Sequence, residues 1–224
     1  DWQGKTIVQI SDVHANGVHG RDFIEKLISR LNLIRKDAVF ITGDYFDGPT
    51  GNIADLAAPL KDLRAEKGVY FVSGNHETYA GMDKITAALA GTGVRILRDE
   101  KITIDGLNIL GVDYPQMSQP KDMSAVFNKL DPGAANIVLY HEPKKTVVEL
   151  AKAAGTSLML AGHTHAGQIF PVGLIGHLIY GKYYDGAYRE NNFTLYTTSG
   201  VGTWGPPIRT GNIPEIVVIT LEKK

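Results

Sequence analysis

Residues that could bind metal ions gather in five short stretches of this sequence. The stretches are SDVH with Asp12 and His14, GDYFD with Asp44 and Asp47, GNHE with Asn75, His76 and Glu77, the single His141, and GHTHAGQ with His163 and His165. Oxygen and imidazole ligands without sulfur suit Mn²⁺, iron or Zn²⁺, and a carboxylate can bridge two ions about 3.5–4 Å apart. Each stretch taken singly is also compatible with a polar turn or a surface loop. Together they indicate a metal site.

Each of these stretches directly follows a run of β-branched and apolar residues. The runs are TIVQI, AVFIT, VYFVS, NIVLY and SLMLA, and a sixth run, LNILGV, lies between the third and the fourth. Open α/β sheets bind their ligands at the carboxyl ends of the strands. Five of the seven histidines lie at these ends, which scattered surface histidines would not do. His19 and His177 match no stretch, and we interpret both as structural or surface residues.

Helical patterns alternate with these strands through the first two thirds of the chain. We expect helices over residues 21–35, 53–66, 83–90, 123–130 and 144–154, and strands in FTLYTTS (193–199) and PEIVVITLEK (214–223). Strand, loop and helix in repeated order predict an α/β layered fold. We find no repeat, low-complexity tract or linker, so residues 1–224 are interpreted as one domain.

Composition excludes several classes of function. The chain has 224 residues, of which 43% are hydrophobic, a net charge of −1 and a pI near 6.7. This charge gives no general cationic field, so nucleic acid is not favoured as a partner. The absence of cysteine excludes disulfides, thiolate ligands and a cysteine nucleophile.

No apolar run reaches the roughly 18 residues of a membrane span. The opening DWQGKTIVQI lacks a methionine, and we expect that an N-terminal signal or anchor is missing.

The five stretches, in this order, resemble the calcineurin-like metallophosphoesterase superfamily. Its signature is DxH, GDxxD, GNH[DE], a single His and GHxH, and this chain has every part of it between residues 12 and 165. GHTHAGQ together with SGVGTWGPPIRTGNIPEI is similar to a bacterial branch whose members are often associated with the membrane or cell wall. The resemblance implies a four-layer αββα sandwich and a location at the membrane or cell envelope, on a side that the sequence leaves open.

The resemblance also implies a role for each residue of the site. Asp12, His14 and His165 would hold one divalent ion, Asn75, His141 and His163 the other, and Asp44 would bridge both. A hydroxide that bridges the ions would attack phosphorus. His76 would protonate or stabilise the leaving oxygen, and Asp47 would orient His76 or merely cap a turn. Glu77 would support the backbone.

Arg209, in GPPIRTG, is the predicted contact to a substrate phosphate. It lies between Gly/Pro turns, and a solvated loop arginine is an equal alternative. The predicted function is hydrolysis of phosphodiester or pyrophosphate bonds in a small or lipid-linked substrate. Two alternatives are a pyrophosphatase of the type that hydrolyses UDP-diacylglucosamine and a catalytically silent metal-binding scaffold. The sequence leaves the native metal and the oligomeric state open.

Residues 171–188, PVGLIGHLIYGKYYDGAY, form a second candidate feature. Leu174, Ile175, Leu178 and Ile179 recur at helical spacing and predict a short apolar helix with tyrosines nearby. This stripe either packs into the core or lies exposed and makes a peripheral contact with a membrane or an acyl chain.

Overall fold

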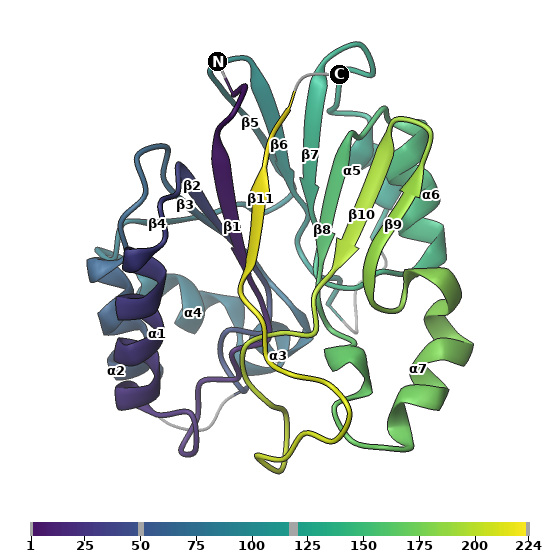
Figure 1. The fold of residues 1–224 in the computed structure, drawn as a ribbon. Helices are drawn as coiled ribbons and strands as arrows, with labels where there is room; N and C mark the ends of the chain where they lie inside the picture. Colours follow the sequence, from purple (N-terminus) through teal and green to yellow (C-terminus); the bar gives the residue numbers. More distant parts are fainter. Residues whose placement is uncertain (1, 49–51, 117–120, 223–224) are drawn as a thin grey trace.

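Two β-sheets lie face to face between layers of helices in the computed structural model, which describes residues 2–48, 52–116 and 121–222 (Figure 1). The first sheet has the order β11-β1-β2-β3-β4. Its strands β1 (Thr6–Ile10), β2 (Ala38–Thr42), β3 (Val69–Val72) and β4 (Val94–Ile96) run parallel, and β11 (Val217–Thr220) is antiparallel to β1.

The second sheet has the order β5-β6-β7-β8-β10-β9. Its central strands β6 (Leu107–Gly111), β7 (Ala135–Leu139), β8 (Leu158–Ala161) and β10 (Phe193–Thr197) run parallel. The edge strands β5 (Glu100–Ile104) and β9 (Gly186–Glu190) are antiparallel to their neighbours. β2, β3 and β6 are buried along their whole length, as expected for parallel strands covered on both faces.

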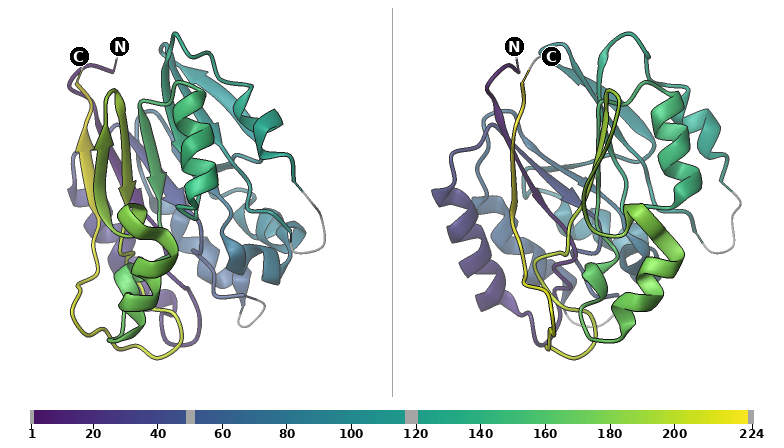
Figure 2. Two further views of the ribbon diagram at one scale, coloured as in Figure 1. Left: turned by 90° about the vertical axis from the view of Figure 1, so that its right-hand side faces the viewer. Right: turned by 45° about the vertical axis from the view of Figure 1, so that its right-hand side comes forward.

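Helices cover the outer face of each sheet. The helices α1 (Arg21–Leu33), α2 (Ile53–Ala57) and α4 (Met82–Leu89) pack on the first sheet, and α5 (Met123–Phe127) and α6 (Lys145–Ala153) pack on the second. A third apolar cluster, which includes Phe40 and Leu139, lies between the sheets. The views in Figure 2 show the same layers. The four-layer αββα prediction is therefore confirmed.

Several elements differ from the sequence expectation. The helix expected over residues 53–66 ends at Ala57 and continues as the 3₁₀ helix η1 (Ala58–Asp62), because Pro59 has no backbone N–H to donate. β4, β5 and β9 and the helix α3 (Asn75–Ala80) were not predicted. β11 occupies the middle of the strand expected over residues 214–223, and residue 223 lies outside the described residues.

The carboxyl ends of β1, β2, β3, β7 and β8 meet at one end of the molecule, where α3 and α7 (Val172–Tyr180) also lie (Figure 1). The two termini lie at the opposite end. The short 3₁₀ helices η2 (His165–Gly167) and η3 (Gly181–Tyr183) flank α7. Within the described residues, no helix combines the length and apolar character that crossing a bilayer requires.

Candidate metal centre

Six of the seven predicted metal ligands meet in two clusters at the carboxyl ends of the strands. One cluster contains Asp12, His14 and His165, and the other contains Asp44, His141 and His163. Within each cluster, one possible ligand atom from each residue lies within 4.8 Å of the others. The clusters draw on both sheets, since β1 and β2 belong to the first and β7 and β8 to the second.

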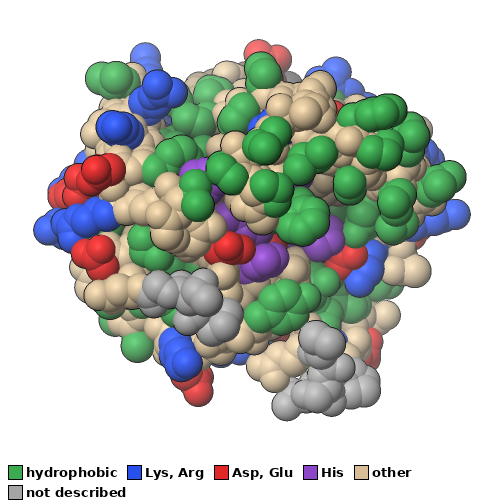
Figure 3. Space-filling view, turned by 90° about the horizontal axis from the view of Figure 1, so that it is seen from below, with side chains coloured by type: hydrophobic (Ala, Val, Ile, Leu, Met, Phe, Trp, Pro, Cys, Tyr) green, Lys and Arg blue, Asp and Glu red, His purple; other side chains and the backbone are tan. Residues whose placement is uncertain are grey.

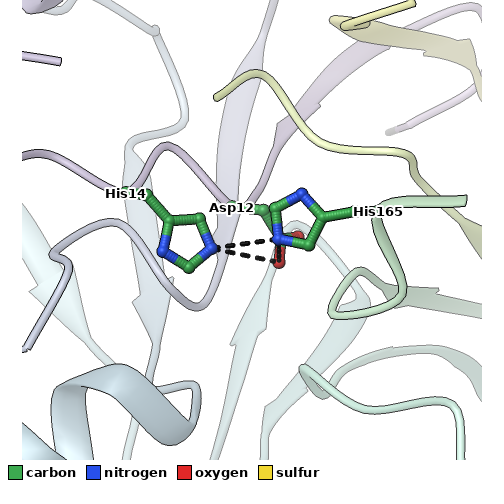
Figure 4. A group of neighbouring side chains, drawn as sticks. All are labelled: Asp12, His14 and His165. Carbon is green, nitrogen blue, oxygen red and sulfur yellow. Dashed lines mark hydrogen bonds and ion pairs between the residues drawn. The ribbon is translucent and has the colours of Figure 1, made fainter. Parts of the chain in front are cut away.

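The first cluster is fully buried around Asp12 (Figure 4). Nε2 of His165 lies 3.3 Å from Oδ1 of Asp12, and Nε2 of His14 lies 4.0 Å from the same oxygen. The Nε2 atoms of the two histidines are 3.0 Å apart. Two imidazole nitrogens and a carboxylate oxygen that converge in this way form a donor set for a divalent cation.

Asp44 belongs to the second cluster and also lies close to the first. Its Oδ2 is 3.0 Å from Nε2 of His141 and 4.0 Å from Nε2 of His14. Nδ1 of His163 is 3.2 Å from Nε2 of His141 on the far side. The Asp44 carboxylate therefore has the position that a bridging ligand would need.

In two of these rings, those of His141 and His14, the second nitrogen lies beside an oxygen acceptor. Nδ1–H of His141 donates to the carbonyl oxygen of Thr42 at 2.8 Å, and Nδ1 of His14 lies 3.0 Å from Oδ1 of Asp47. A hydrogen bond at Nδ1 fixes the tautomer in which Nε2 carries a free lone pair, and metal-bound histidines usually show this arrangement. These residues thus fit a metal ion by their chemistry as well as by their position.

Asn75, the seventh predicted ligand, is buried as the first residue of α3. Among the described residues, none donates a hydrogen bond to its side-chain oxygen Oδ1. An unpaired buried oxygen costs free energy, and a cation would satisfy it. This observation is consistent with the predicted role of Asn75 as a ligand.

The backbone is left-handed at most of these positions. The φ angles are 53° at Asp12, 48° at His14, 50° at Asp44, 72° at His163 and 50° at His165. Left-handed backbone is unfavourable for residues with a side chain and is concentrated at functional sites. Because these residues sit in turns after the strands, His163 and His165 point into different clusters, unlike alternate residues of a strand.

Two glycines give the carboxylates their space. A Cβ added to Gly162 would overlap the carboxylate of Asp12, and one added to Gly74 would overlap that of Asp44. The glycine in GHTH therefore makes room for an aspartate from another strand. Backbone N–H groups that follow these glycines also bind the two carboxylates. The N–H of His163 donates to Asp12, and the N–H of His76 donates to Oδ1 of Asp44 at 2.9 Å.

Glu77 stabilises the loop that carries Asp44 through hydrogen bonds to its backbone. Its buried carboxylate accepts hydrogen bonds from the backbone N–H groups of Asp44 at 2.8 Å, Phe46 at 3.0 Å and Gly74 at 2.7 Å. Burial raises the pKa of Glu77 to about 7. These contacts agree with the predicted supporting role of Glu77.

Asp47 contacts both His76 and His14. Its Oδ1 is 3.0 Å from Nδ1 of His76 and 3.0 Å from Nδ1 of His14, and its Oδ2 accepts from the side chain of Asn16 at 2.8 Å. The hydrogen bond from His14 lowers the pKa of Asp47 to about 2. Burial lowers the pKa of His76, whose side chain is 25% exposed. Sequence reasoning expected the contact with His76 and missed the contact with His14.

The pKa values of the cluster residues are shifted by burial and by the neighbouring charges. Burial opposes ionisation of Asp44, but the neighbouring His141 and His14 outweigh it and hold the pKa of Asp44 well below its usual range. Burial also opposes protonation of His141, but Asp44 raises the pKa of His141 to about 10. Burial lowers the pKa of His165 to about 3. A cation bound between these groups would take the place of the proton on His141.

Arg209 is half-buried against the loops of the site. Its guanidinium donates to the carbonyl oxygens of Ser199 at 2.9 Å and Gly202, and to the side chain of Asn212 at 2.9 Å. Its Nη1 also lies 3.4 Å from the carbonyl oxygen of His165. These bonds tie the loop over residues 199–212 to the loop that holds the histidines. Contact of Arg209 with a substrate phosphate stays a prediction.

One polar group beside the site was missed by sequence reasoning. Glu142 is buried, and its carboxylate accepts from Tyr114 at 2.9 Å and from Tyr180 at 2.9 Å. It also lies 3.9 Å from Nε2 of His163. The signal in the sequence was the acidic residue directly after His141. Through Tyr180, this group connects the end of α7 to the second cluster.

A family model described as calcineurin-like phosphoesterase matches residues 5–167 of this chain. The chain is 33% identical over 223 residues to a Helicobacter pylori protein named as an uncharacterized metallophosphoesterase, with 97% of this chain and 60% of that protein covered. It is 30% identical over 238 residues to a Danio rerio protein named transmembrane protein with metallophosphoesterase domain, with 98% and 54% covered. The chain thus spans somewhat more than half the length of these relatives.

Among solved structures, the chain is similar to a dimetal phosphatase from Danio rerio. The TM-score is 0.60, with 12% sequence identity, and the match covers 99% of this chain and 94% of that one. At this identity the likeness shows the shared fold.

Proposed function

The chain belongs to the calcineurin-like phosphoesterase family, and from that premise we propose that it hydrolyses phosphodiester or pyrophosphate bonds with two divalent metal ions. The observation that carries the proposal is the position of Asp44, whose Oδ2 lies 3.0 Å from Nε2 of His141 in its own cluster and 4.0 Å from Nε2 of His14 in the other. Asp12, His14 and His165 would hold one ion, and Asn75, His141 and His163 the other. Such ions supply Lewis acidity and an activated water for in-line attack on phosphorus.

His76 is proposed to act on the leaving oxygen. It lies beside the first cluster, with its ring centroid 4.6 Å from that of His14, and is partly exposed, so that a substrate can reach it. Because Nδ1 of His76 lies 3.0 Å from Oδ1 of Asp47, the Nε2 atom of His76 is the one that can give a proton to a departing alkoxide or phosphate. Asp47 would orient this ring and at the same time fix the tautomer of His14.

The test is hydrolysis of bis(p-nitrophenyl) phosphate by protein loaded with Mn²⁺, compared with protein treated with a chelator. We expect turnover only with metal, and a loss of turnover in His76→Ala that is smaller with this good leaving group than with a diester of a poor leaving group. His19→Ala is the matched control, since His19 contacts Phe23 and Thr203 and belongs to neither cluster. Metal-loaded wild-type protein without turnover would favour a silent metal-binding scaffold.

A lipid-linked pyrophosphate is the second candidate substrate. It is favoured by one observation, the exposed aliphatic side chains of α7 next to the histidines of the site. A panel of soluble nucleotides, phospholipids, UDP-sugar lipids and cell-wall phosphodiesters, with products identified by mass spectrometry, distinguishes the substrates. Cleavage of soluble diesters and nucleotides alone would remove the lipid-linked candidate.

A further inference from the structure

The helix α7 turns its smallest side chains toward the protein. Gly173, Gly176 and Tyr180, spaced like one face of a helix, are only partly exposed. A Cβ added to Gly176 would overlap the buried ring of Tyr184, and a Cβ on Gly167 would overlap the backbone of Gly173. Tyr180 completes this inner face with its hydrogen bond to Glu142. The helix is therefore attached to the protein through glycines, Tyr180 and His177, whose ring centroid lies 4.1 Å from that of Tyr184.

The large aliphatic side chains of α7 face away from the protein. Leu174 is 59% exposed, Ile175 58%, Leu178 86% and Ile179 65%. In α1, by contrast, the aliphatic residues at helical spacing are buried against the sheet. The outer face of α7 is therefore not part of the core. On a face exposed to water, polar residues would be expected in place of these aliphatic ones.

Further exposed apolar side chains lie on the loop that follows β10. Trp204 is 48% exposed and Ile208 is 56% exposed. This loop is bound to the loop after β8, because the Nε2 group of Gln168 donates to the carbonyl of Trp204 and Thr210 donates to that of Gln168. We call Leu174, Ile175, Leu178, Ile179, Trp204 and Ile208 the apolar rim. In Figure 3, hydrophobic side chains gather beside the histidines of the site on this face.

The two segments that carry the apolar rim contain no acidic residue. Residues 163–184 and 191–214 contain no aspartate or glutamate, and of their two cations Arg209 is bonded to the carbonyls of its own loop. Lys182 directly follows α7 and is exposed. A surface with negative phosphate headgroups would therefore meet no acidic residue in either segment.

We propose that the apolar rim docks this face of the protein onto the surface of an anionic lipid bilayer. The inference rests on the proposed function in one respect, that the face beside the metal ligands must stay open to a phosphoester substrate. A protein partner or a second copy seated on the rim would cover this face. A bilayer covers it as well, but it presents phosphoester headgroups to the site in doing so. Trp204 has the amphipathic side chain that such interfaces favour.

Cosedimentation with vesicles of equal parts phosphatidylcholine and phosphatidylglycerol tests the proposal without any measurement of turnover. We expect the double variant Leu174→Ser with Ile179→Ser to bind these vesicles at least about tenfold more weakly than wild type, because two buried aliphatic side chains are lost from the contact. Leu33→Ser is the matched control: Leu33 is 88% exposed at the end of α1, outside the rim, and its replacement should leave binding unchanged. Both variants should hydrolyse bis(p-nitrophenyl) phosphate as wild type does.

Tryptophan fluorescence gives a second, local readout. The chain has two tryptophans, and Trp2 is 7% exposed with its indole N–H bonded to the carbonyl of Ile104 at 2.7 Å. A blue shift on addition of vesicles therefore reports on Trp204, and it should persist in Trp2→Phe.

Equal vesicle binding by wild type and the double variant, or an equal loss in Leu33→Ser, would overturn the proposal. So would a self-association of wild-type protein in sedimentation velocity that the double variant lacks, with no vesicle binding by either, since this outcome identifies a second copy as the occupant. Vesicle binding without turnover would leave the docking surface standing and contradict the proposed function. Turnover without vesicle binding would support the proposed function and contradict the docking surface.

Discussion

Replacement of Asp44 by asparagine removes one negative charge from the place where the second cluster approaches the first, while it keeps the size of the side chain. Oδ1 of Asp44 accepts the N–H of His76, so the amide oxygen of the asparagine must take that place. Its NH₂ group, which has no lone pair for a cation, then faces Nε2 of His141, where Oδ2 lies 3.0 Å away in the wild type.

The size of the effect follows from that distance. At an effective dielectric constant of about 20, opposite unit charges 3.0 Å apart attract by about 5.5 kcal/mol, equivalent to about 4 pKa units. The pKa of His141 is raised from 6.5 to about 10 in the metal-free protein. The rise has the direction and the approximate size expected when the attraction to Asp44 outweighs the opposing effect of burial. In Asp44→Asn we expect the pKa of His141 to fall to about 6.5 or below.

For metal binding the loss is larger, because a divalent ion carries twice the charge of the imidazolium. We expect at least one ion to bind about 10³-fold more weakly or worse. Turnover should fall further than in a variant that loses a terminal ligand, such as His163→Ala. The assay combines metal analysis of the purified protein with an NMR pH titration of the imidazole nitrogens in chelator-treated protein.

Asp37→Asn is the control for a lost carboxylate. Asp37 directly precedes β2, whereas Asp44 follows it, and its partner is Lys5 at 3.0 Å. This variant should keep both ions and the raised pKa of His141. Full occupancy by two ions with near-normal turnover in Asp44→Asn would refute the bridging role, and an unchanged His141 pKa would refute the electrostatic reasoning.

Three further predictions test the surroundings of the clusters. His76→Ala should keep both ions and lower kcat by roughly 10²–10⁴ for poor leaving groups, with a smaller loss for p-nitrophenolate; equal losses for both would argue against a role at the leaving oxygen. The lowered pKa of Asp47, from 3.8 to about 2, contributes about 2 kcal/mol to the free energy of unfolding above pH 3.8, and this contribution is lost as the pH falls through 2. Chemical denaturation should therefore show Asp47→Asn as less stable than wild type at pH 7 and nearly equal to it near pH 2, and a constant difference would contradict this origin. Gly162→Ala should displace the carboxylate of Asp12 and lower metal content, whereas Gly91→Ala, at a glycine with left-handed backbone and open space around it, should lower stability alone; an unchanged metal content in Gly162→Ala would disprove the packing argument.

The order of the elements and the types of the site residues could be predicted from the sequence, because both depend on local patterns. Alternation of apolar strands and helical stripes is determined by side-chain periodicity, and it predicted an α/β layered fold. The four-layer αββα arrangement was predicted from the resemblance to the superfamily. The placement of polar residues after β1, β2, β3, β7 and β8 predicted that they meet, since parallel strands end at the same edge of a sheet. Edge strands such as β9, in which most residues are exposed, carry a weaker pattern and were missed.

Contacts between distant parts of the chain were decided only by the tertiary structure. The separation of His163 and His165 into different clusters follows from left-handed backbone in the turn after β8 and from the approach of Asp12 over Gly162. The second contact of Asp47, with His14, requires the loops after β1 and β2 to lie side by side. An apolar stripe such as that of α7 has the same spacing whether it is buried or exposed. Its exposure was decided by Gly173 and Gly176, which allow the inner face, and not the aliphatic face, to approach Tyr184.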